Sequence, residues 1–240
     1  MEERTCCSSQ HPEQCLLCGK PLTYFTQQRQ MECAVCHRKL PADAACESGH
    51  FVCDDCHRGG GAELLGLMGR SRERDPIALY LAACALEGVH LHGPEHHCIV
   101  PCALLTAFRN CGGAIDLEKS LAEAWRRGQK ISGGSCGFLG VCGAAAGAGI
   151  FASIVIGATP LKEKEWAIPQ RLTARCLDAI AAVGGPRCCK RTGRIAIETA
   201  AAFAETELGV KMPLSRPPCT YCGRNRECIR DRCPFFPGKE

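Results

Sequence analysis

The chain has 240 residues, which is enough for one main hydrophobic core with small appendages. Only 5% of the residues are aromatic, and a core built from Ala, Val, Leu and Gly packs helix on helix more readily than sheet on sheet. The formal net charge is +4, but thiolates bound to metal at the sites proposed below would bring it to about −1, so the composition does not indicate a nucleic-acid partner.

The 22 cysteines are the most informative feature of the composition. The first fourteen residues are polar and do not resemble a secretory signal, so we expect a cytoplasmic protein with reduced thiols rather than a disulfide framework. Reduced cysteines at paired spacing indicate metal sites or redox chemistry. Because so many thiolates are vulnerable to oxidation, we expect an anaerobic or strongly reducing cell.

The N-terminal part reads as a knuckle module that needs metal to fold. Its eight candidate ligands follow the spacing C-x2-C, C-x2-C and C-x3-H-x2-C-x2-C: Cys15, Cys18, Cys33, Cys36, Cys46, His50, Cys53 and Cys56. Such a set is typical of two structural zinc sites without an open coordination position.

Six of these positions match the spacing of a RING-like cross-brace. That pattern predicts one zinc on Cys33, Cys36, Cys53 and Cys56, and a second on Cys15, Cys18, Cys46 and His50. A RING takes its last ligand pair from downstream, whereas here the pair lies upstream, and this permutation argues against ubiquitin-ligase function. The alternative is sequential pairing, in which Cys15 and Cys18 join Cys33 and Cys36.

Three helices are predicted after the Gly59-Gly60-Gly61 linker. Asp75 caps the first and Pro76 occupies its first turn. The second opens near His96, His97 and Cys98 and ends before Gly112, and the third runs from Asp116 to Arg127. The three neighbours at the start of the second helix are candidate site residues, although an isolated histidine is more often a capping or surface residue.

The stretch from Ile131 to Leu161 is rich in Gly and Ala and carries no charge over about twenty residues, a length that could span a bilayer. We interpret it as a buried helix of the core that Pro160 ends, with a single membrane span as the alternative. Cys136 and Cys142 open the stretch, six residues apart, which suits a loop thiol beside a thiol at a helix start. A helix N-terminus lowers a thiol pKa.

A further helix is predicted from Trp166 to Val183, and another from Ile195 to Leu208. Between them, Cys188 and Cys189 follow a Gly-Gly-Pro turn among three cations, Arg187, Lys190 and Arg191. Cationic neighbours depress a thiol pKa, so we prefer a functional role to the alternative of two small buried side chains.

The C-terminal segment has the spacing C-x2-C-x5-C-x4-C, formed by Cys219, Cys222, Cys228 and Cys233. Four thiols within fifteen residues predict a separate metal site that holds either zinc or an iron–sulfur cluster.

Three passages carry a resemblance: GPEHH with CALLTAFRN, SCGFLGVCGAAAGAGI, and GGPRCCKR. With the knuckles and the Cys-Pro tail, they resemble an uncharacterised cysteine-rich domain family of methanogens and other anaerobes, whose members stand alone or are fused to methyltransferase-type domains. A shorter stretch is similar to the small helical redox-active family named for its C-GCAxxG-C-C pattern. That similarity implies that Cys98, Cys136, Cys142 and Cys188 or Cys189 form one thiol site.

The sequence therefore predicts a mainly α fold. It comprises a zinc-binding knuckle module at residues 1–61, a helical domain around the buried Gly/Ala-rich helix at 62–212, and a four-cysteine metal site at 213–240. We expect metal-dependent thiol redox or sulfur-transfer chemistry at a central site, which could hold an iron–sulfur cluster, a catalytic metal or a persulfide carried between thiols. The alternative is a non-catalytic, zinc-stabilised adaptor that docks a methyltransferase or redox enzyme. The central candidates are Cys136, Cys142, Cys188, Cys189, His96, His97 and Cys98. Neither a membrane span nor a nucleic-acid partner is expected.

Overall fold

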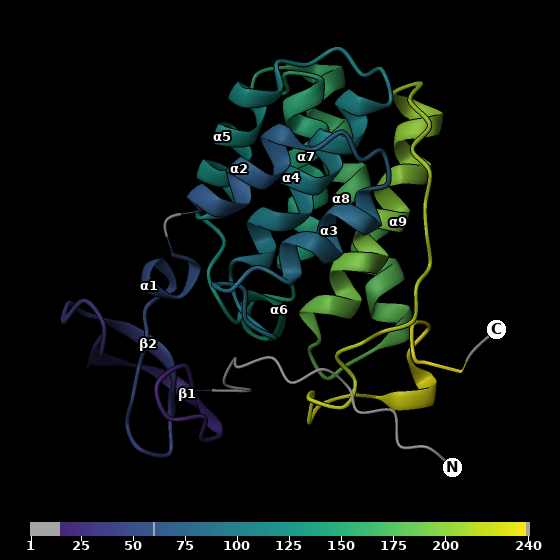
Figure 1. Ribbon diagram of the computed structural model, residues 1–240. Helices are drawn as coiled ribbons and strands as arrows, with labels where there is room; N and C mark the ends of the chain where they lie inside the picture. The colour runs from purple at the N-terminus through teal and green to yellow at the C-terminus, as the bar shows by residue number, and fades with distance from the viewer. Residues whose placement is uncertain (1–14, 60, 239–240) are drawn as a thin grey trace.

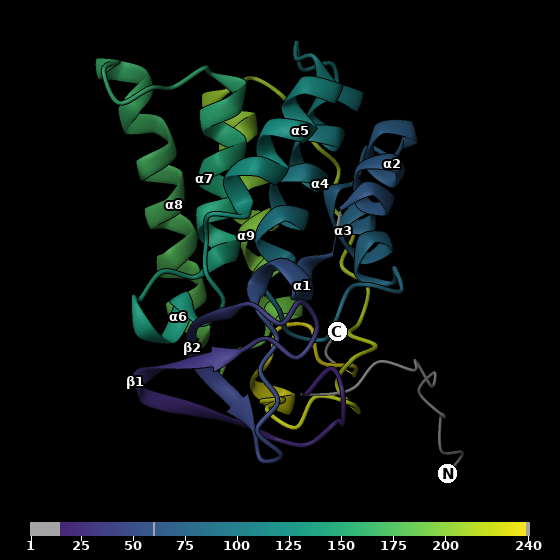
Figure 2. The same cartoon turned by 90° about the vertical axis from the view of Figure 1, so that its left-hand side faces the viewer.

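The computed structural model describes residues 15–59 and 61–238, and about half of the chain is helical, as predicted (Figure 1). A small N-terminal module lies against one end of a larger helical body (Figures 1 and 2). Cys6 and Cys7 lie outside the described residues.

The module consists of a β-hairpin and a short helix. Strands β1 (Leu22–Glu32) and β2 (Lys39–Cys46) are antiparallel and are followed by α1 (Asp54–Arg58). The hairpin buries little apart from Ala42, Ala45 and the cysteines around it, and an isolated two-stranded sheet is marginally stable in water. The module therefore depends on whatever its cysteines bind and on its contacts with the helical body.

The helical body is built from the elements that follow in the chain. They are α2 (Ala62–Arg70), α3 (Pro76–Cys84), α4 (His96–Asn110), α5 (Leu117–Gly128), α6 (Ser135–Phe138), α7 (Gly143–Val155), α8 (Glu163–Val183) and α9 (Cys189–Glu207). The predicted cap is present, since Asp75 accepts from the N–H of Ile77 at 2.8 Å; Asp116, predicted to lie within a helix, is the N-cap of α5 and accepts from the N–H of Lys119 at 3.2 Å.

The most completely buried helix is α4, in which every residue from His96 to Phe108 is buried. The Gly/Ala-rich helix α7 packs against α4. It is therefore one of the core helices and not the helix around which the others pack. A β-carbon at Gly147 would lie only 2.9 Å from Cδ of Pro101, so the missing side chain lets the two helices approach closely.

Helix α7 is shorter than predicted, because it ends at Val155. Gly157 follows with a φ of +61°, and α8 begins at Glu163. Pro160 therefore does not end it. No helix in residues 15–59 and 61–238 has both the length and the apolar character needed to cross a membrane.

Helix α9 begins at Cys189, six residues earlier than predicted, and Cys188 is its N-cap. The C-terminal segment then returns along this helix and folds beneath the body (Figure 1, yellow), where Arg194 donates to the carbonyl oxygen of Pro217 at 2.7 Å. A 3-10 turn, η1 (Arg230–Arg232), lies within that segment. A small apolar cluster of Ile195, Ile229, Cys233 and Phe235 attaches it to α9.

Candidate metal centres and a thiol-lined cavity

Two groups of four side chains in the N-terminal module could each hold a metal ion. One consists of Cys15, Cys18, Cys46 and His50, and the other of Cys33, Cys36, Cys53 and Cys56; within each group the ligand atoms lie within 4.8 Å of one another. These are the two ligand groups that the cross-brace pattern predicts. The alternative, in which Cys15 and Cys18 join Cys33 and Cys36, is not formed. The hairpin is responsible, because its register places Leu22, near the first pair, opposite Cys46.

Hydrogen bonds prepare these sulfurs to carry negative charge. The backbone N–H groups of His50 and Cys53 point at the sulfurs of Cys46 and Cys33, each at 3.3 Å. Arg38 donates to Cys36 at 3.4 Å, and this bond lowers the pKa of the Cys36 thiol to about 6. Thiolate is the form that binds metal, so this bond favours metal binding at Cys36, whereas burial raises the pKa values of the Cys53 and Cys56 thiols in the same group.

The short helix α1 connects the second metal group to the helical body. Asp54, directly after ligand Cys53, accepts from the N–H of Gly133 at 2.8 Å. Arg58 donates to the carbonyl oxygen of Ile131 at 2.9 Å. Both contacts reach the loop that leads into Cys136, so the module and the loop hold each other in position.

His57, directly after ligand Cys56, makes a third connection. Its Nδ1 lies 3.0 Å from the carboxylate of Glu95, which also accepts from the N–H of His90 at 2.9 Å. The Glu95 side chain is buried; burial alone would raise its carboxyl pKa, but the hydrogen bond with His57 and the charge of that ring lower it to about 2. A buried carboxylate thus ties the module to the start of α4.

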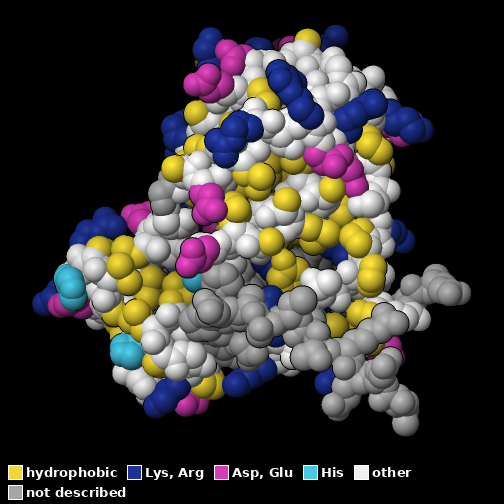
Figure 3. Space-filling model, in the orientation of Figure 1, with side chains coloured by type: hydrophobic (Ala, Val, Ile, Leu, Met, Phe, Trp, Pro, Cys, Tyr) yellow, Lys and Arg dark blue, Asp and Glu magenta, His cyan; other side chains and the backbone are white. Residues whose placement is uncertain are grey.

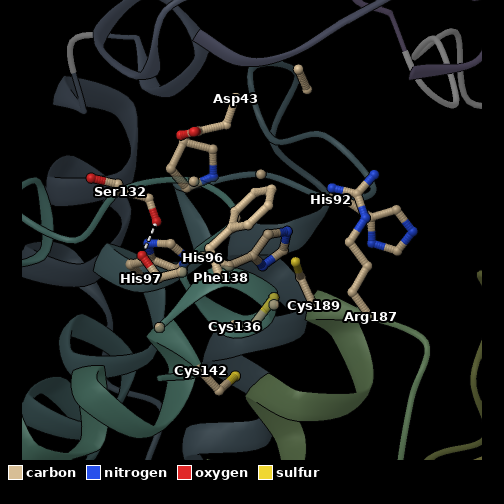
Figure 4. Close-up of a pocket in the computed structure, with 18 of the residues that line it drawn as sticks. Asp43, His92, His96, His97, Ser132, Cys136, Phe138, Cys142, Arg187 and Cys189 are labelled. Carbon is tan, nitrogen blue, oxygen red and sulfur yellow. Dashed lines mark hydrogen bonds between the residues drawn. The ribbon is translucent and has the colours of Figure 1, made fainter. Parts of the chain in front are cut away.

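Between the module and the body lies a cavity of about 1410 Å³, here called the central cavity. Figure 3 shows apolar side chains gathered where the module faces the helical body. Three of the cysteine thiols that line the cavity come from three different elements of the helical body (Figure 4): Cys136 on α6, Cys142 at the N-cap of α7, and Cys189 in the first turn of α9. The structure therefore brings the two predicted cysteine stretches, separated by about fifty residues, to the same end of the body.

The central thiols differ in exposure. Cys136 is exposed, whereas Cys142 is buried and the thiol of Cys189 is shielded from solvent. Burial raises the pKa of the Cys189 thiol to about 12, and it also raises the pKa of the Cys136 thiol, with the nearby Cys142 adding to the shift. The prediction that neighbouring cations depress these pKa values is therefore wrong, because burial outweighs them.

Only one of the three predicted cations faces the central thiols. Arg187 lines the cavity and favours the thiolate forms of Cys136 and Cys189. Lys190 is instead buried against the carbonyl oxygen of His90 at 3.0 Å, and Arg191 donates to the carbonyl oxygens of Gly184 and Pro186. Arg187 is thus the cation available to charges in the cavity.

Two aromatic side chains follow Arg187 along the cavity wall, Tyr24 beside its guanidinium and Phe138 beside Tyr24. The guanidinium lies 5.4 Å from the centre of the Tyr24 ring, and that ring lies 5.8 Å from the ring of Phe138. Tyr24 comes from β1 of the module, and its electrostatic neighbours include Cys136 and Cys189. The module therefore contributes part of the cavity wall.

The predicted histidines have different roles. His96 is buried and held by Tyr80 and by the carbonyl oxygen of His90, each at 3.1 Å, so it supports the fold. His97 Nδ1 donates to the carbonyl oxygen of Ile131 at 3.0 Å, which leaves the lone pair on Nε2 beside Gly143 in the cavity wall. Burial lowers the pKa of both rings, so they are neutral at pH 7.

Cys98 does not join the central cavity. Its sulfur lies against Gly128 and points toward the carbonyl oxygen of Trp125 at 3.7 Å, where α4 packs on α5. Burial raises its thiol pKa to about 12, as expected for a packed side chain.

The C-terminal cysteines are not arranged like the N-terminal groups. No third set of metal-ligating side chains in the described part of the chain lies within 4.8 Å of one another, so Cys219, Cys222, Cys228 and Cys233 do not form a site for one ion in this structure. Cys188 accepts a hydrogen bond from Nδ2 of Asn225 in the C-terminal segment at 3.5 Å. It lines a cavity beside that segment and also lines the central cavity. The prediction that the C-terminal and central thiols stay apart is therefore wrong for Cys188.

Sequence reasoning missed the residues that connect these sites. Asp54, His57 and Arg58 have a signal in retrospect, since they are polar residues within two positions of candidate metal ligands. No feature of the sequence marks Glu95 or His92 as connecting residues. His92 Nε2 donates to Oδ1 of Asn225 at 3.2 Å, while its buried Nδ1 has no hydrogen-bond partner within the described ranges.

Comparison with known proteins gives a family but no activity. No curated protein and no solved structure matches the chain. A family model described as "Family of unknown function (DUF5714)" matches residues 65–236, which include helices α3 to α9, the central cysteines and the C-terminal cysteines but not the N-terminal metal groups. The chain therefore belongs to this family of unknown function.

Proposed function

We propose that this protein is a zinc-stabilised thiol protein that performs redox chemistry, or sulfur transfer between the same thiols, in the central cavity. The observation that carries the proposal is the convergence of Cys136, Cys142 and Cys189 on one cavity beside Arg187. Three thiols from three separate elements, next to a cation, exceed what packing of small side chains requires. We place this activity in the reducing cytoplasm of an anaerobic cell.

Zinc is the metal that best suits the N-terminal groups. Two sulfurs bound tetrahedrally to one zinc at about 2.3 Å stand about 3.8 Å apart. The Cys18–Cys46 and Cys36–Cys53 sulfur pairs lie 3.7 and 3.8 Å apart. Because each group already offers four ligands, no position is left for a substrate, and both zinc ions are structural.

The central thiols suit reversible oxidation. Burial raises the pKa values of the Cys136 and Cys189 thiols, which keeps these two protonated and therefore protected until an oxidant enters. Forming a disulfide between two of them releases two electrons and two protons to the oxidant. The exposed Cys136 is the thiol that an incoming molecule meets first, and Arg187 stabilises the thiolate that must form during exchange.

Mass spectrometry after limited oxidation tests the proposal. Anaerobically purified, zinc-loaded protein is treated with one equivalent of diamide, which accepts the two electrons and two protons. We expect a disulfide that links Cys136 to Cys142 or Cys189, and its absence from the Cys136→Ser variant. Cys111→Ser is the matched control, because Cys111 lies at the end of α4 outside the cavity. A first disulfide that involves none of the three central cysteines would refute the proposal.

A second candidate is a zinc-stabilised adaptor that docks a methyltransferase or redox enzyme. The observation that favours it is an exposed apolar segment beside Cys136: the exposed fractions are 49% for Phe138, 72% for Leu139 and 37% for Val141. An adaptor would rescue a deletion strain even when all three central cysteines are replaced by serine. A thiol enzyme would not.

A further inference from the structure

A second cavity, of about 310 Å³, lies between α9 and the C-terminal segment. Five cysteines line it: Cys188, Cys219, Cys222, Cys228 and Cys233. The remaining wall is largely apolar and includes Tyr221 and Phe235. This five-thiol cavity is distinct from the N-terminal metal groups, and Cys188 and Arg191 separate it from the central cavity.

The arrangement does not fit a single zinc ion. Ligands of one zinc lie close together, as in the N-terminal module, whereas these sulfurs surround a space and form no such group. An iron–sulfur cube distributes its four thiolates over four different irons, so its ligands stand farther apart around a larger object. A cavity surrounded by five thiols has the size and the chemistry to hold an iron–sulfur cube rather than a single zinc ion.

The charge of the cavity wall points in the same direction. Lys190, Arg191 and Arg194 line the cavity and are only 2–3% exposed. None of the three forms an ion pair with a carboxylate among residues 15–59 and 61–238. The Nε groups of Arg191 and Arg194 also have no hydrogen-bond partner there. Three buried cations that form no ion pair with a carboxylate are costly, so this wall favours an anionic occupant.

Hydrogen bonds to the sulfurs are already in place. The backbone N–H groups of Tyr221 and Arg230 point at the sulfurs of Cys219 and Cys228, each at 3.4 Å. The side-chain amide of Asn225 donates to Cys188 at 3.5 Å. Donors of this kind stabilise the negative charge on cluster-bound sulfur and tune its reduction potential.

We infer that the five-thiol cavity binds a [4Fe–4S] cluster, held by four of its five cysteines and neutralised by Lys190, Arg191 and Arg194. With four thiolates the oxidised cluster carries a net charge of about −2, which the three cations balance. The cluster lies next to the central cavity, because Cys188 and Cys189 are consecutive residues that line the two cavities. The inference stands independently of the chemistry proposed for the central thiols.

Anaerobic reconstitution of the full-length chain with ferrous iron and sulfide tests this inference. We expect about four irons per chain, absorbance near 400 nm and two zinc ions retained. The Cys219→Ser/Cys233→Ser variant leaves only three thiols at the cavity and should lose this iron while it keeps both zincs. The matched control, Cys136→Ser/Cys142→Ser, should keep the iron, which separates cluster binding from the central chemistry. Uptake of a third zinc and no iron, or equal iron in both double variants, would overturn the inference.

A second variant tests the cluster without removing any ligand. Arg194→Gln keeps all five thiols and removes one buried positive charge, so the cluster should form and its midpoint potential should become more negative than in the wild type. Circular dichroism establishes that the variant folds. A midpoint potential unchanged from the wild type would contradict the placement of the cluster beside Arg194.

Discussion

The carboxylate of Asp54 accepts a hydrogen bond from the backbone N–H of Gly133 at 2.8 Å. Asp54 directly follows a ligand of the second metal group, and Gly133 lies three residues before Cys136. The contact therefore joins the metal module to the segment that carries the exposed thiol of the central cavity. A metal ion bound by that group would therefore be coupled to the loop before Cys136 through this hydrogen bond.

The first prediction concerns this contact. Asp54→Ala leaves the Gly133 N–H without its acceptor and should cost about 1 kcal/mol of stability. It should also loosen the loop, so that iodoacetamide labels Cys136 several-fold faster. Glu32→Ala is the control, because Glu32 is an exposed acidic residue that pairs with His37 within the module at 3.1 Å. Equal labelling rates in the two variants would show that the loop does not depend on the module.

Metal removal gives the second prediction. The module has little apolar core of its own, whereas the helical body has a continuous one. A strong chelator should therefore make the segment from Cys15 to Arg58 sensitive to protease, while the far-UV circular dichroism of the body persists. Loss of all helical signal on chelation would show instead that the metals hold the whole chain.

Much of this organisation is visible in the sequence. The ligand spacing predicts the cross-brace membership of both metal groups, because short loops between ligand pairs leave few geometries. The Asp75 cap predicts the start of α3, since a cap is a local interaction, and the amphipathic pattern predicts α5. The position of Cys98 against α5 could not be predicted, because it depends on which face of α4 each neighbour covers. The same holds for Cys188, which borders two cavities only after the C-terminal segment has returned along α9.

The third prediction concerns the close approach of α4 and α7. Gly147→Ala gains up to about 1 kcal/mol in helix propensity. The added β-carbon would lie 2.9 Å from Pro101 Cδ and 3.2 Å from the carbonyl oxygen of His97, and such overpacking costs about 1–3 kcal/mol. We expect a net loss of about 1–2 kcal/mol in chemical denaturation. Gly137→Ala, where nothing lies within 4 Å of the added carbon, should not be destabilised, and a Gly147→Ala variant as stable as that control would refute the packing argument.

The fourth prediction is a pH dependence that arises at His92. Burial, together with the charge of Arg187, lowers the pKa of this imidazole from 6.5 to about 4. On acidification the unfolded chain therefore takes up the proton first, so stability falls as the pH drops from about 6.5 to about 4 and does not depend on this group above that range. The full effect is about 3 kcal/mol.

Denaturant titrations across this pH range test the prediction. His92→Gln should flatten the pH profile, with part of the loss remaining because the pKa values of His96 and His97 are also lowered by burial. His37→Asn removes an exposed histidine and should keep the wild-type profile. A His92→Gln profile parallel to that of the wild type would show that His92 is not held neutral in the folded protein.

The order of oxidation and zinc release tests the central claim most directly. Anaerobic, zinc-loaded protein is titrated with diamide while a chromogenic chelator reports free zinc and mass spectrometry identifies oxidised cysteines. Because metal coordination and N–H···S bonds protect the module's thiolates, the first equivalent should oxidise Cys136 with Cys142 or Cys189, and zinc should stay bound. Zinc release at or before the first disulfide, with the central thiols still reduced, would contradict thiol chemistry in the central cavity.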